Sequence, residues 1–152
     1  MGRARVVRTA SVLSAALALV ACASDGDDDP TEPEYLEALQ RICAATTATL
    51  AQLPEPPDQI SIADFAADVA SALTDEAEQI RQLDPPDELD DDHRAIIANT
   101  DDQADAWDTL GATPDTDAEG LAEASARVAE LTLGRSDLAA EIGADDCVRA
   151  PG

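Results

Sequence analysis

From residue 34 onward, the apolar residues of the chain recur at steps of three and four, and no long stretch alternates with a period of two. Steps of three and four place side chains on one face of a helix. Four such stripes follow one another, over residues 35–53, 62–83, 89–110 and 121–142. The pattern predicts an all-α fold, and the short links favour an antiparallel up-and-down four-helix bundle over residues 34–152.

Prolines and a capping residue mark the ends of the first helices. The proline-rich links at residues 54–57 and 84–86 stop them, because proline is tolerated in a first helical turn and not within a helix. Ser61 stands three residues before Asp64, which is the spacing of a helix N-cap. The second helix is therefore predicted to begin directly after Ser61.

The fourth helix carries signals for both ends and for an interruption. Thr116 and Glu119 have the spacing of a capping box, which places the N-cap at Thr116. Gly134 and Ser136 indicate a kink or a short break near the middle of the helix. Gly143 is a typical C-terminal stop.

The N-terminal segment has the anatomy of a signal peptide. Arg3, Arg5 and Arg8 form a positive region, and residues 9–21 are uncharged and mostly apolar. A membrane-spanning helix is the alternative, but it needs about 20 apolar residues, and here a polar acidic tract follows. Residues 1–21 are therefore predicted to be a removable signal segment.

The quartet Leu19-Val20-Ala21-Cys22 resembles a bacterial lipobox, after which the cysteine is lipidated and becomes the mature N-terminus. At least two acyl chains at Cys22 would anchor the protein stably to the extracytoplasmic face of the cell membrane. Ala21-Cys22-Ala23 also fits a small-residue cleavage pattern that would release a soluble protein after Ala23. Residues 22–33 are acidic and lack large apolar side chains, so they are expected to form a disordered tether.

Two further cysteines, Cys43 and Cys147, form an even pair in an oxidising compartment, so a disulfide is expected. In an up-and-down bundle, the end of the fourth helix returns to the end where the first helix begins, which brings Cys147 back toward Cys43. Two free buried thiols are the alternative. A metal role is weaker, because no third soft ligand lies near either cysteine in the sequence.

The lipobox, the acidic tether, the cysteine pair and the ending Gly143-Ala144-Asp145-Asp146-Cys147 together make the chain similar to a loose group of small helical lipoproteins from actinobacteria. The resemblance spans the full chain, and the lipobox is its most specific part. It implies a location and a helical fold, and no common activity or catalytic residue comes with it. Similar proteins tend to have an apolar residue after the closing glycine, where this chain has Ala144.

Carboxylates dominate the charge. The chain has 33 Asp and Glu and nine arginines, which gives a formal net charge of −24. The residues after Ala21 hold all 33 carboxylates and six of the arginines, so their side-chain charge is −27. Nucleic acids and anionic membrane surfaces are bound by clustered cations, so both are excluded as the main partner. A cationic protein, peptide or small molecule fits better. Many acids fall between apolar positions, as on solvated helix faces: Asp75, Glu76, Glu78, Asp101, Asp102, Asp105 and Asp108.

Little in the chain points to catalysis. His93 follows Asp90, Asp91 and Asp92 and could act as a base or a metal ligand, but it also lies in register with the apolar stripe, where a histidine paired with an acid is the simpler interpretation. The run from Asp115 to Gly120 imitates half of a calcium loop, and its twelfth position is Ala126 instead of glutamate. No nucleophile stands in a recognisable motif, and no cofactor is implied.

The sequence therefore predicts a monomeric, non-catalytic binding or interaction module that is displayed at the cell surface. The alternative is a metal-handling protein or an enzyme that uses His93 and the neighbouring aspartates.

Overall fold

The computed structural model describes residues 30–54 and 61–148, and every secondary-structure element within these ranges is a helix. In chain order its elements are α1 Glu32–Leu50, α2 Ile62–Ile80, the short 3-10 helix η1 Asp87–Leu89, α3 Asp90–Ala112, α4 Ala118–Glu141 and the 3-10 helix η2 Asp145–Cys147. The predicted signal segment, the lipobox cysteine and most of the predicted tether lie outside the described residues.

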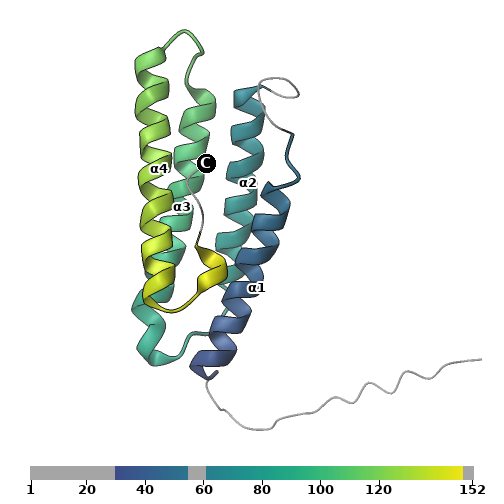
Figure 1. Cartoon of the computed structure of the whole chain (residues 1–152), viewed down its shortest axis with the longest axis vertical. Coiled ribbons are helices and arrows are strands. Elements are labelled where there is room, and N and C mark those ends of the chain that lie inside the picture. Colours follow the sequence, from purple (N-terminus) through teal and green to yellow (C-terminus); the bar gives the residue numbers. More distant parts are fainter. Residues whose placement is uncertain (1–29, 55–60, 149–152) are drawn as a thin grey trace, which may run out of the picture.

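The helices form the predicted up-and-down bundle (Figure 1). α1 packs against α2, α2 against α3, and α3 against α4. In the described part of the chain, α1 has no extensive packing against α4; each of these two helices instead contacts η2, which lies between them (Figure 1). The C-terminal 3-10 turn therefore completes the bundle on its fourth side.

The start of α1 is stabilised by a capping box that lies partly within the predicted tether. Glu34 accepts hydrogen bonds from the backbone N–H of Thr31 at 3.0 Å and from its hydroxyl at 2.6 Å. These bonds hold the pKa of the Glu34 carboxyl below its ordinary value, with the hydroxyl contributing most. Glu32 and Pro33 consequently belong to the first turn of the helix, where proline is tolerated.

The predicted cap of α2 is confirmed, and the predicted cap of α4 is wrong. The hydroxyl of Ser61 accepts the backbone N–H of Asp64 at 3.1 Å. At α4, however, Asp117 is the N-cap and accepts the N–H of Gly120 at 3.0 Å, so the Thr116–Glu119 pair does not form the cap. Only glycine fits there without a shift, since a Cβ on Gly120 would lie 2.5 Å from Asp117 Oδ2.

α4 runs as one continuous helix through Gly134 and Ser136, so the chain has no break at the position where a kink or a short break was expected. A glycine inside a helix costs about 1 kcal/mol relative to alanine, which tertiary packing readily outweighs. The packing here is close: Asn99 of α3 donates a hydrogen bond to the carbonyl of Leu131 at 3.3 Å, and a Cβ on Gly134 would lie 3.4 Å from the same amide nitrogen.

α4 ends in a Schellman turn at the predicted glycine. Gly143 has a left-handed φ of +76°. Its N–H donates to the carbonyl of Ala140 at 3.3 Å, and the N–H of Ala144 donates to the carbonyl of Ala139 at 2.8 Å. The turn directs the chain into η2 and buries Ala144 completely, so the small side chain fits a tight site between the helices.

The largest apolar cluster surrounds η2 and the disulfide. Cys43 and Cys147 are bonded and fully buried, which confirms the predicted pairing. The cluster draws on α1, α2, α3, α4 and η2, through the following buried residues: Tyr35, Leu39, Cys43, Ile80, Ile96, Ala139, Ile142, Ala144 and Cys147. The terminal turn is therefore part of the core.

Candidate functional site

A buried ion pair lies at the centre of the bundle. Arg135 of α4 and Glu76 of α2 have no exposed surface, and Arg135 Nη2 lies 3.0 Å from Glu76 Oε1. This contradicts the prediction for Glu76, which was placed on a solvated helix face. The neighbouring acids Asp75 and Glu78 are exposed as expected.

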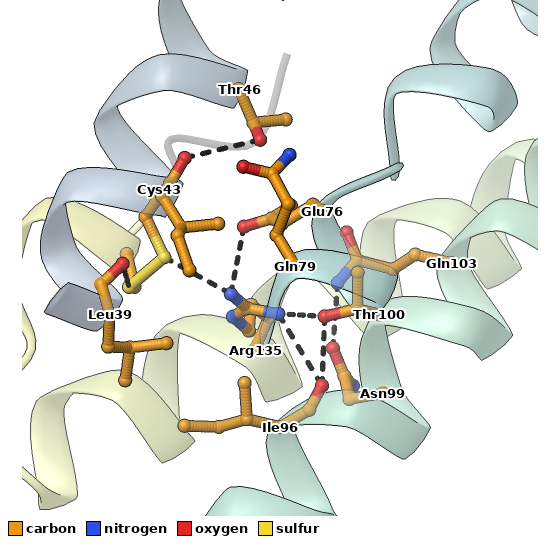
Figure 2. A network of polar contacts seen from close by, with 12 residues as sticks. Leu39, Cys43, Thr46, Glu76, Gln79, Ile96, Asn99, Thr100, Gln103 and Arg135 are labelled. Atoms are coloured by element: carbon orange, nitrogen blue, oxygen red, sulfur yellow. Dashed lines mark hydrogen bonds and ion pairs between the residues drawn. A yellow bond between two sulfur atoms is a disulfide. The ribbon is translucent and has the colours of Figure 1, made fainter. Parts of the chain in front are cut away.

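The same guanidinium contacts the other two helices (Figure 2). Nη1 donates to the hydroxyl of Thr100 and to the carbonyl of Ile96, the latter at 3.5 Å, both in α3. Nη2 also lies 3.3 Å from Sγ of Cys43 in α1. One arginine thus joins all four helices and touches the disulfide.

Further polar side chains extend this network along α3 (Figure 2). The hydroxyl of Thr100 donates to the carbonyl of Ile96 at 2.8 Å, and the amide of Gln103 donates to Asn99 Oδ1 at 2.7 Å. Thr100 and Gln103 are at most 2 % exposed. Because buried polar groups are costly unless they are hydrogen-bonded, such a network fixes the relative positions of the helices that supply it.

A signal for the buried pair is present in the sequence. Glu76 continues the α2 stripe of Val69, Leu73 and Ile80 at steps of four, three and four. Arg135 likewise falls at core spacing in α4, between Leu131 and Leu138. The position of a residue within the stripe predicts burial here better than its charge does.

The predicted acid partner of His93 is wrong. His93 is only 7 % exposed, and its Nδ1 lies 3.1 Å from the hydroxyl of Tyr35 in α1. Burial lowers the pKa of His93 below its ordinary value, although Asp90 acts in the opposite direction. Burial also raises the pKa of Tyr35 to about 12. The buried imidazole of His93, hydrogen-bonded to the phenol of Tyr35, links α3 to α1 and exposes little surface to which a substrate could bind.

The described residues contain no group of three or more His, Cys, Asp or Glu side chains arranged to hold a metal ion. In the stretch that imitates a calcium loop, Asp117 is engaged as the helix cap. None of the described helices is long and apolar enough to cross a membrane.

The outer faces of the bundle are acidic. Over residues 30–54 and 61–148, each of the five arginines pairs with at least one carboxylate, for example Arg81 with Asp101, and Arg127 with Asp102 and Glu130. Many more carboxylates than arginines are present, so this region retains a strong negative charge.

Comparison with known proteins adds no assignment: no family model, no curated protein and no solved structure matches the chain.

Proposed function

We propose that this protein is an exported lipoprotein, anchored through Cys22 to the extracytoplasmic face of the cell membrane, and that it acts there as a non-catalytic binding module. The observation that carries the proposal is the lipobox Leu19-Val20-Ala21-Cys22 behind a positively charged region and an apolar run. Two acyl chains on one cysteine suffice for stable anchoring.

The pairing of the other two cysteines supports this proposal. Disulfides persist in oxidising compartments outside the cytoplasm. Cys43 and Cys147 are bonded to each other, which leaves Cys22 as the remaining cysteine of the chain. A bundle cross-linked in this way suits a protein that works outside the cytoplasm.

The partner we propose is cationic: a basic protein, a basic peptide or a positively charged small molecule. The support is the excess of carboxylates on the outside of the bundle, including the exposed Asp102, Asp105 and Asp108 of α3. Fields of this sign attract cations and repel nucleic acids. Binding to a lysine-rich peptide should weaken steeply as salt is added, whereas a neutral peptide of equal length should not bind. Equal binding of both peptides would contradict a charge-based partner.

Fractionation of cells tests the anchor. The wild-type protein should be recovered in the membrane fraction and should be released by detergent. Cys22→Ser removes the lipid acceptor and should prevent processing and lipidation of the chain, whereas the matched control Ser24→Ala leaves the lipobox intact and should behave as wild type. Recovery of the wild-type protein in the soluble fraction, cleaved after Ala23, would refute the anchor.

A further inference from the structure

The two sulfurs of the disulfide have different surroundings. Cys43 lies within α1, and its Sγ is 3.3 Å from the buried guanidinium of Arg135. Cys147 is the last residue of η2, and it follows the exposed carboxylates Asp145 and Asp146. A positive charge therefore adjoins one sulfur, and two negative charges precede the other in the sequence.

We propose that reduction of this disulfide has a preferred direction. An incoming thiolate attacks Sγ of Cys147, and Cys43 leaves as the thiolate. The sulfur that is better stabilised as a thiolate is the better leaving group in thiol–disulfide exchange. Arg135 favours that form of Cys43, as neighbouring arginines do for reactive thiols. Asp145 and Asp146 disfavour it for Cys147, because like charges repel.

Glu76 shares the guanidinium with Cys43 and moderates this effect. Its Oε1 lies 3.0 Å from the same Nη2 that contacts the sulfur. Loss of the Glu76 charge should therefore strengthen the stabilisation of a Cys43 thiolate, and loss of the Arg135 charge should abolish it.

Access also favours attack at Cys147. Both cysteines are fully buried in the closed bundle. However, Cys147 belongs to a three-residue turn, held in part by its own N–H to the carbonyl of Ala144 at 2.9 Å, and the next residue, Val148, is 46 % exposed. Short terminal turns open locally far more easily than the middle of a packed helix. The chain on the Cys147 side of the bond therefore opens more readily than α1, on which Cys43 lies, so an incoming thiolate reaches Cys147 first.

The reductant we infer is an exported dithiol. Its first thiol loses a proton to solvent, and the resulting thiolate bonds to Cys147 as the bond to Cys43 breaks. The electron pair of that bond stays on Cys43, which then takes up a proton from solvent. Its second thiol, deprotonated, then displaces the Cys147 thiolate and closes the reductant's own disulfide, and the released proton goes to Cys147. One protein disulfide becomes two thiols, one dithiol becomes one disulfide, and η2 loses its covalent link to α1.

A monothiol reports the direction of attack when its mixed disulfide is trapped early, before the freed cysteine re-forms the bond or a second thiol completes the reduction. The detergent-extracted protein is treated briefly with glutathione, quenched with N-ethylmaleimide and digested with trypsin, which places the two cysteines in separate peptides, residues 42–81 and 136–149. We expect glutathione on Cys147 and maleimide on Cys43, with a preference of about tenfold or more. Equal labelling, or glutathione mainly on Cys43, would overturn the proposal. The result does not depend on the lipid anchor.

Two variants isolate the part played by Arg135. The double variant Glu76→Gln, Arg135→Gln removes both charges together. Its preference for glutathione on Cys147 over Cys43 should fall at least about threefold, because the Cys43 thiolate loses one stabilising charge. Glu76→Gln alone should raise it. An unchanged preference in the double variant, in protein that retains the helical circular dichroism of wild type, would contradict the role of the guanidinium.

Discussion

Removal of one member of the buried ion pair should destabilise the bundle far more than removal of both. Arg135→Met leaves the Glu76 carboxylate in the core without the guanidinium that neutralises it. Breaking a fully buried pair in this way costs about 3–5 kcal/mol. The lost hydrogen bond to Thr100 adds about 1 kcal/mol.

The double variant Glu76→Leu, Arg135→Met replaces the pair by apolar side chains of similar size. Because the cost of removing two charges from water then disappears, the stability should return to within about 1 kcal/mol of wild type or exceed it. The double variant should therefore be more stable than the sum of the two single changes would give, by at least about 3 kcal/mol.

Urea unfolding with the disulfide intact measures these differences. With a slope of about 1.5 kcal/mol per M, Arg135→Met should lower the urea midpoint by about 3–4 M. Arg127→Met, on the same helix, removes an arginine from partly exposed pairs and should cost at most about 1 kcal/mol. A cost for Arg135→Met no larger than that of Arg127→Met, or a double variant as unstable as the sum of the two single changes, would show that the two buried charges do not stabilise each other.

Three other perturbations should have defined results. Cys43→Ser with Cys147→Ser opens a cross-link between residues 104 positions apart and should lower the unfolding free energy by about 4–5 kcal/mol; a loss below about 1 kcal/mol would contradict a core role for η2. Burial lowers the pKa of His93, so the unfolded chain binds the proton more tightly than the folded chain, and stability should fall as the pH drops below about 6.5. In denaturant titrations at several pH values, His93→Gln should reduce this dependence of stability on pH. Gly120→Ala should lower the thermal midpoint, since its Cβ would lie 2.5 Å from Asp117 Oδ2; an unchanged midpoint would show that this cap adapts freely.

Much of the fold could be predicted from the sequence because its signals are local. The apolar periodicity identified four helices, the serine at position 61 and the glycine at 143 marked ends correctly, and the even cysteine pair gave the disulfide. The N-cap of α4 was misplaced by one residue, because Thr116 and Asp117 are both good capping residues, and in the structure Asp117 accepts the N–H of Gly120.

The buried ion pair at the centre of the bundle was not predicted. Charged residues were assigned to the surface, even where their spacing continues an apolar stripe. Glu76 was placed outside although it continues the α2 stripe, and its partner Arg135 lies on another helix, 59 residues away. Likewise, His93 was expected to pair with a nearby acid, whereas its hydroxyl partner Tyr35 lies 58 residues away on α1. Pairings of this kind are properties of the packed structure.

The intact mass of the protein extracted from membranes is the most direct test of the lipid anchor at Cys22, since it reports processing, lipid addition and cysteine state together. The expected mass is that of residues 22–152 with a diacylglyceryl group on Cys22, with or without an additional acyl chain, less the two hydrogens lost in the Cys43–Cys147 bond. The mass of an unmodified chain, whether it begins at Met1 or at Ser24, would contradict the anchor.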